Sequence, residues 1–93
     1  MENRVRLGLK KLLNIAHDDT GQGRRVANFL LAWWNAEALG GYDIADLFAV
    51  DREVSEDMAT IFTYLAREED AVYPTDYRGE IKSLIKRWRP EKV

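Results

Sequence analysis

The sequence predicts an all-α protein, a compact bundle of four main helices and one short helix, and three observations support this. Three segments each carry five apolar residues at offsets of 0, 4, 7, 8 and 11, the spacing of one helix face. The only prolines are Pro74 and Pro90, so proline interrupts no helix before residue 74. With 93 residues, 46% of them hydrophobic, and a net charge of -2, the chain has the composition of a single helical domain over residues 1–93.

The three segments that share this spacing are expected to form helices over residues 3–17, over 52–68, and from a cap at Thr75 or Asp76 up to Pro90. Each has one narrow apolar face that should pack inward, with charged side chains on the rest of its circumference. The apolar faces are Val5, Leu9, Leu12, Leu13 and Ala16; Val54, Met58, Ile61, Phe62 and Leu65; and Tyr77, Ile81, Leu84, Ile85 and Trp88.

The fourth main helix is expected from a cap at Asp19 or Thr20 to about Leu39, and its apolar surface is broader. Gly40-Gly41 ends it, because glycine adopts the left-handed backbone of a helix C-terminus. Two adjacent apolar stripes together cover an arc of roughly 200°. This breadth predicts either the central helix of the bundle or a helix partly covered by a second subunit, and we expect this helix to be the central element. One stripe contains Val26, Phe29, Leu30 and Trp33, and the other, the candidate interface, contains Ala27, Leu31, Trp34 and Ala38.

A short helix is expected over residues 44–48 and a longer one after it, with Asp43 and Asp51 as the respective N-caps. Residues 44–62 therefore resemble a degenerate helix-turn-helix, a motif that places its second helix in the major groove of DNA. The turn lacks the usual glycine, and DNA phosphates would repel the acidic side chains of the second helix, Glu53, Glu56 and Asp57. DNA binding through this segment is therefore the alternative function and not the preferred one.

A glycine-rich turn opens the helix after residue 20 and is followed at once by two arginines. Free backbone N–H groups and the helix dipole favour an anion at such a position. The candidate anion site consists of Thr20, Gly21, Gly23, Arg24 and Arg25. It lacks the lysine and the spacing of a nucleotide-binding loop. The alternative, which we favour, is an ordinary helix start whose arginines pair with acidic residues further along the chain.

His17, the only histidine, is followed by Asp18 and Asp19. One imidazole and two adjacent carboxylates do not specify a metal site, and a histidine at a helix C-terminus is more often a donor to free carbonyl groups. The chain has no cysteine, so thiol catalysis and cysteine-bound metals are excluded. We therefore expect no cofactor, no metal, no catalytic residue and no enzymatic activity.

Charge is divided into three blocks. Residues 1–41 carry a net +2, residues 42–73 a net -7 and residues 74–93 a net +3. An acidic middle between two basic ends predicts segments that attract one another, within a subunit or between subunits. The basic tail also contains Trp88, but this residue lies on an apolar stripe and is expected in the core instead of stacking on a nucleic acid.

The chain resembles an uncharacterised family of small bacterial proteins of unknown function that are often encoded on plasmids and integrative elements. Residues 20–37, Gly40-Gly41-Tyr42-Asp43 and the ending Lys86-Arg87-Trp88-Arg89-Pro90 carry the resemblance, which covers roughly Leu12 to Pro90. It implies no activity. It does favour a role in interaction with the host or an accessory role on a mobile element.

Together these observations predict a non-enzymatic protein-interaction module that associates with itself, or with another protein, around Trp33 or Trp34. Adjacent tryptophans point about 100° apart on a helix, so one bundle need not cover both. No stretch approaches the roughly 20 apolar residues of a membrane span, and the first residues lack the apolar core of a signal peptide. We expect a cytoplasmic protein with no membrane partner.

Overall fold

Helices form all of the regular structure in the computed structural model, which describes residues 1–93. The α-helices are α1 (Asn3–Ala16), α2 (Gly21–Leu39), α3 (Arg52–Ala66) and α4 (Arg78–Trp88). Three short 3-10 segments accompany them: η1 (Ile44–Ala49), η2 (Thr75–Tyr77) and η3 (Pro90–Lys92). The predicted all-α class, with four main helices and a short one between the second and third, is confirmed.

The core is a single cluster to which all four α-helices contribute. The predicted face of α1 is buried in full, and Val26, Leu30, Met58, Ile61 and Leu84 are buried with it. Each of these side chains loses its contact with water because a neighbouring helix lies opposite, which is the main source of stability in such a bundle.

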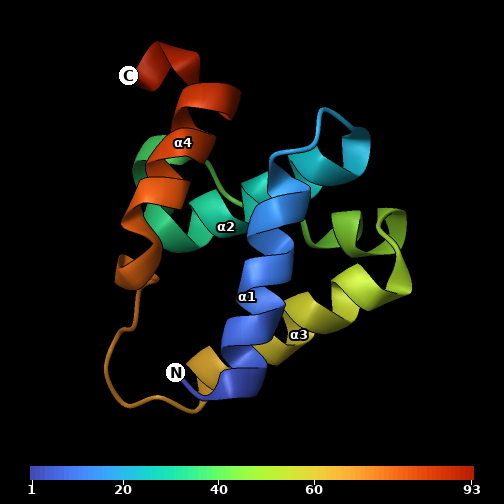
Figure 1. Ribbon diagram of the computed structural model, residues 1–93, viewed down its shortest axis with the longest axis vertical. Coiled ribbons are helices and arrows are strands. Elements are labelled where there is room, and N and C mark those ends of the chain that lie inside the picture. Colours follow the sequence, from blue (N-terminus) through green and yellow to red (C-terminus); the bar gives the residue numbers. More distant parts are fainter.

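The central helix is α1, which corrects the expectation that α2 has this place. α1 packs against α2 and α3 and also touches α4, whereas α2 packs mainly against α1 and α4. Figure 1 shows α1 crossing in front of α2, with α4 to one side and α3 to the other. The broad apolar arc of α2 has a different cause: part of it faces α1 and α4, and part borders a groove described below.

The ends of α2 follow the predicted chemistry, with one addition near its C-terminus. Thr20 Oγ1 accepts a hydrogen bond from Gly23 N at 2.9 Å, and Gly40 ends the helix with a φ of +96°. Asn35 is not helical, with φ -169° and ψ 84°, so the helix is kinked there. Asn35 Oδ1 accepts from Ala38 N at 3.2 Å and so caps the last turn.

One predicted feature of α3 is wrong, and a second holds for the position of the residue but not for its capping bond. Phe62, expected in the core, keeps 64% of its surface exposed, because no helix covers that side of α3. Asp51 occupies the N-cap position but makes no capping bond within α3. Its backbone N–H donates instead to Gln22 Oε1 at 2.7 Å, which ties the start of α3 to the start of α2.

Polar contacts from the last residues of the chain close the other end of the bundle. Trp88 Nε1 donates to Ala16 O at 2.7 Å, so Trp88 packs against the core as expected. Arg89 Nε donates to Leu39 O at 2.9 Å, and its Nη2 donates to Asn28 Oδ1 at 2.7 Å. These bonds connect the end of α4 to α1 and α2.

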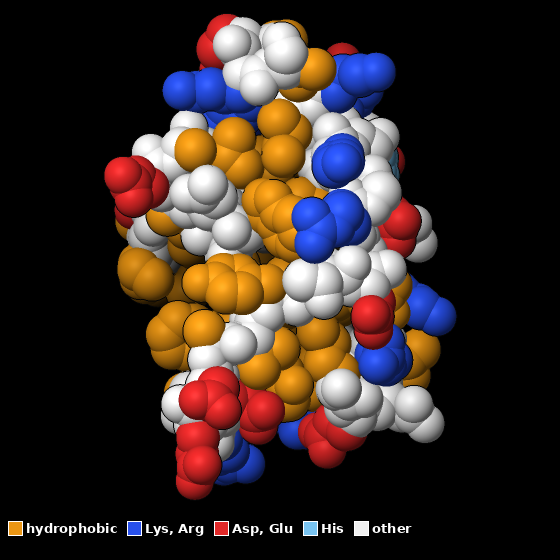
Figure 2. Space-filling model, turned by 90° about the vertical axis from the view of Figure 1, so that its left-hand side faces the viewer, with side chains coloured by type: hydrophobic (Ala, Val, Ile, Leu, Met, Phe, Trp, Pro, Cys, Tyr) orange, Lys and Arg blue, Asp and Glu red, His pale blue; other side chains and the backbone are white.

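No helix in the structure combines the length and the apolar character that crossing a lipid bilayer requires. The side of the molecule that carries α4 has hydrophobic side chains in a band, with Lys and Arg mainly in its upper part and Asp and Glu clustered at the lower left (Figure 2).

Candidate functional site

An apolar groove of about 990 Å³ opens between α2, η1 and α3. Eleven of its fifteen lining residues are hydrophobic. Phe29, Ala32 and Trp33 line it from α2, and Tyr42 lines it from the linker that follows. The remaining lining residues come from η1 and α3: Ile44, Leu47, Phe48, Arg52, Ser55, Glu56, Met58, Ala59, Phe62, Thr63 and Leu65.

Three large apolar side chains of this groove face solvent. Phe48 is 92% exposed, Ile44 is 65% exposed and Phe62 is 64% exposed. A scattered exposed hydrophobic residue is ordinary on a protein surface, but three around one groove form a contiguous patch. Such patches on small soluble domains are typical of protein interaction sites.

Tyr42 and Phe29 form part of the groove floor. Their rings pack edge to face, with centroids 5.4 Å apart, and the Tyr42 hydroxyl lies 3.7 Å from Met58 Sδ. Burial raises the pKa of the Tyr42 phenol above its ordinary value, and the carboxylates of Asp46 and Asp43 raise it further, while Arg25 opposes them. The floor is therefore uncharged at neutral pH.

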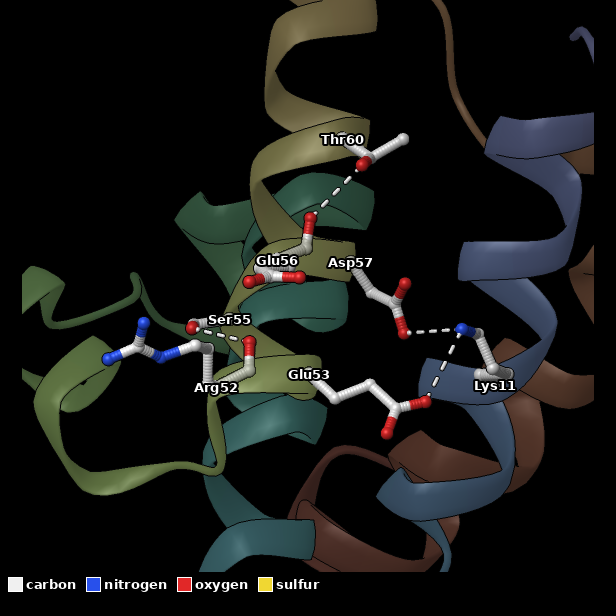
Figure 3. Close-up of polar contacts among 7 residues, drawn as sticks. All are labelled: Lys11, Arg52, Glu53, Ser55, Glu56, Asp57 and Thr60. Carbon is white, nitrogen blue, oxygen red and sulfur yellow. Dashed lines mark hydrogen bonds and ion pairs between the residues drawn. The ribbon is translucent and has the colours of Figure 1, made fainter.

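The two charged residues in the groove are Arg52 and Glu56, one helical turn apart on α3. Both are exposed, and neither makes an ion pair within the chain. The acidic side chains on the opposite side of α3 are paired: Lys11 Nζ of α1 lies 3.8 Å from Glu53 Oε1 and 3.3 Å from Asp57 Oδ2. Figure 3 shows Glu53 and Asp57 turned toward α1, while Arg52 and Glu56 are turned away from it.

The glycine-rich turn and the start of α2 hold η1 and the start of α3 in place. Arg25 Nε lies 3.5 Å from Asp46 Oδ1, and both side chains are about three-quarters buried, at 26% and 24% exposure. Gln22 Nε2 lies 3.4 Å from Asp51 Oδ2, beside the backbone bond to Gln22 Oε1. Arg25 therefore pairs with a carboxylate of the acidic middle segment, residues 42–73. This is the pairing expected if the turn is an ordinary helix start.

The other residues of the candidate anion site either contribute to the structure of the turn or face solvent. Thr20 caps α2, Gly21 lies next to the Arg25 guanidinium, Gly23 packs against backbone carbonyls of α1 and the turn after it, and Arg24 is exposed. The basic residues of α1 and α2 account for three contacts with the acidic middle segment, from Lys11 and Arg25. The basic residues of α4 make no ion pair. Within the subunit, the acidic residues 42–73 therefore pair with basic residues of segment 1–41 only, and not with those of segment 74–93 as was also expected.

The candidate interface on α2 is not one surface. Ala27 and Leu31 are fully buried and pack in the core, which corrects their assignment to an interface. Trp34 is half-buried beneath the Arg78 guanidinium, 5.3 Å from the ring centroid, and Ala38 is exposed. Trp33 is also half-buried, and its Nε1 donates to Val72 O at 2.7 Å. One subunit therefore covers both tryptophans in part.

Ile44, Phe48 and Phe62 are the site residues that sequence reasoning missed. Phe62 shares the helical spacing of the core residues, so the pattern alone assigns it to the core. A signal was present in η1, where Ile44, Leu47 and Phe48 follow one another at short spacing in a segment too short to bury all three.

Residues 44–62 form two consecutive helical segments, but η1 is a 3-10 helix without a single buried residue. In a helix-turn-helix the first helix packs against the second, so this segment departs from that motif. His17 occupies the C-cap position of α1, where its backbone N–H donates to Asn14 O at 3.2 Å and that of Asp18 donates to Ile15 O at 3.0 Å. Asp18 and Asp19 follow it in the exposed turn.

The groove, its three exposed apolar side chains and the turn that supports it belong to a small helical protein with an apolar groove at its surface. Comparison with known proteins places the chain in a family: a model described as a family of unknown function (DUF7673) matches residues 6–89, and the chain belongs to this family. No curated protein and no solved structure matches the chain significantly.

Proposed function

We propose that this protein is an interaction module that associates with a second copy of itself through the groove between α2, η1 and α3. The observation that carries the proposal is the 92% exposure of Phe48 at the rim of an apolar groove. Phe48 is a projecting apolar side chain, and the groove beside it, lined by Phe62, Ala59 and Trp33, can receive such a side chain. One subunit therefore carries both parts of a self-complementary contact. Two copies related by a two-fold axis would each insert Phe48 into the groove of the other.

The test compares the molar mass of wild type and two variants by light scattering after gel filtration, over a range of concentrations. Wild type should approach twice its 10.8 kDa chain mass as the concentration rises. Phe48→Asp should stay monomeric and folded, because Phe48 has few contacts within its own subunit. Leu7→Asp is the matched control, since Leu7 is 62% exposed on α1 and lies outside the groove.

A wild type that is monomeric at every concentration would contradict self-association. So would a Phe48→Asp variant that still dimerises, because the dimer would then use another surface. In the same samples, binding to labelled duplex DNA at low and at physiological salt tests the alternative function of residues 44–62. A steep salt dependence would favour that alternative.

An accessory role on a mobile element is a second part of the proposal, and it rests on the resemblance of residues 20–37 and 86–90 described above. It predicts that genes of plasmid or integrative-element maintenance flank the coding sequence, which sequencing of the flanking DNA tests.

A further inference from the structure

We infer that the two-fold axis of the dimer passes between Arg52 and Glu56 of α3, so that each Arg52 pairs with Glu56 of the partner subunit. This inference deepens the proposed function and rests on it, because it takes the groove as the self-association surface. It adds the orientation of the two subunits and the residues that determine their register.

The charges of the groove are the first support. Arg52 and Glu56 are the only charged residues that line it, one of each sign, and neither has an ion-pair partner within its subunit. An occupant that buries them must bring an opposite charge to each of them, or leave them facing apolar groups at a cost in desolvation. A second copy of the same groove brings one positive and one negative group, which matches this requirement.

Only one orientation of two α3 helices makes the match. If the helices run parallel, Arg52 lies opposite Arg52 and Glu56 opposite Glu56, which is repulsive. If they run antiparallel about a point between the two residues, Arg52 lies opposite Glu56 on both sides of the axis. The antiparallel arrangement also sets the helix dipoles in opposite directions, which is favourable.

The order of residues along the chain agrees with this axis. Phe48 precedes Arg52 in the chain, whereas Ala59 and Phe62 follow Glu56. A two-fold axis between Arg52 and Glu56 therefore brings the Phe48 end of one subunit to the Ala59–Phe62 end of the other. The same register therefore satisfies the charges and seats the exposed phenylalanine. Ser55 and Ala59, which line the groove between these points, are small and permit close approach of the two helices.

Charge exchange tests the register. Arg52→Glu and Glu56→Arg should each raise the dimer dissociation constant by about tenfold or more, because both symmetry-related contacts become repulsive. An equimolar mixture of the two variants should recover a heterodimer, in which every contact is again between opposite charges. The double variant Arg52→Glu plus Glu56→Arg should recover a homodimer. Arg67→Glu and Glu69→Arg, which reverse exposed charges outside the groove, are the matched controls and should dimerise as wild type does.

Cross-linking supplies an independent readout, because the natural chain has no cysteine. Ser55 lies beside the inferred axis, so Ser55→Cys should form a disulfide-linked dimer on mild oxidation, whereas Ser83→Cys on α4 should not. If Phe48→Asp abolishes the dimer but Arg52→Glu, Glu56→Arg and Ser55→Cys behave as their controls do, the two-fold register is wrong and the proposed function stands. A monomeric wild type overturns both.

Discussion

Gly23 is the residue at which an added methyl group would meet most resistance. An ideal Cβ there would clash with Asp18 O and lie 2.9 Å from Ile15 O, and both of these atoms belong to backbone. Gly23→Ala should therefore lower the free energy of unfolding by about 1–3 kcal/mol, as other overpacked sites do.

Gly79 is the matched control for this substitution. A Cβ added there has no neighbour within 4 Å, so Gly79→Ala should be neutral or stabilising by up to about 1 kcal/mol. Urea unfolding followed by circular dichroism measures both variants. Equal effects of the two substitutions would show that the turn relaxes and that close packing at Gly23 is unimportant.

Arg25 and its neighbour Arg24 provide a second matched pair. Arg25→Ala leaves the partly buried Asp46 carboxylate without its partner and should cost about 1 kcal/mol. Arg24→Ala, at an exposed position, should change stability by less than about 0.5 kcal/mol. The same denaturant titration measures them. If phosphate raises the melting temperature of wild type and the loss of both arginines abolishes that rise, the turn also binds an external anion.

Tyr42 should make the fold sensitive to alkali. Its pKa is raised in the folded state, mainly by burial, so the folded state favours the neutral phenol more than the unfolded state does. The resulting contribution to stability is fully present below the ordinary tyrosine pKa of 10.0 and is lost as the pH rises through the folded pKa. Melting temperatures from pH 8 to pH 11, about the range of tyrosine titration, should fall less steeply for Tyr42→Phe than for wild type. Identical slopes would contradict this role of Tyr42.

At the scale of the helices, apolar spacing predicted most of the fold because three of the helices bury a single face. Every residue of the α1 stripe is buried as expected, whereas Phe62 on α3 has the same spacing and is exposed. The spacing fixes the angle at which a side chain leaves its helix, but it carries no information on whether a neighbour lies opposite. For this reason the spacing did not predict the exposed position of Phe62 or the groove beside it, which exists where η1 leaves part of α3 uncovered.

The junction of α2 and α4 depends on Arg89, a residue to which the helical pattern assigns no role. Arg89→Ala removes hydrogen bonds to Leu39 O and Asn28 Oδ1 and should cost about 1.5–3 kcal/mol, because the donor is charged and partly buried. Lys86→Ala, at an exposed position of α4, should stay within about 0.5 kcal/mol of wild type. Thermal unfolding distinguishes the two. A loss no larger for Arg89→Ala than for Lys86→Ala would mean that water replaces these bonds.

At the scale of the whole molecule, the apolar residues divide between the core and the exposed surface around the groove. The stripes of α1 and α4 and part of the α2 stripes pack within the subunit, another part of α2 borders the groove, and Ile44, Phe48 and Phe62 remain at the surface. The charges divide in the same way: Lys11 and Arg25 pair within the chain, while Arg52 and Glu56 have no ion-pair partner in it. The proposed self-association rests on this division, because the most exposed phenylalanine lies beside an apolar groove of the same subunit.

The most direct test of this claim is the nuclear magnetic resonance spectrum of the backbone amides, recorded on the wild type over a series of dilutions. Self-association through the groove predicts concentration-dependent shifts that concentrate in η1 and on the outer face of α3, at Ile44, Phe48, Ser55, Ala59 and Phe62. The exposed residues of α1 and α4 should not shift. Spectra that are identical at all concentrations, or shifts confined to α4, would contradict the claim that this groove joins two copies of the chain.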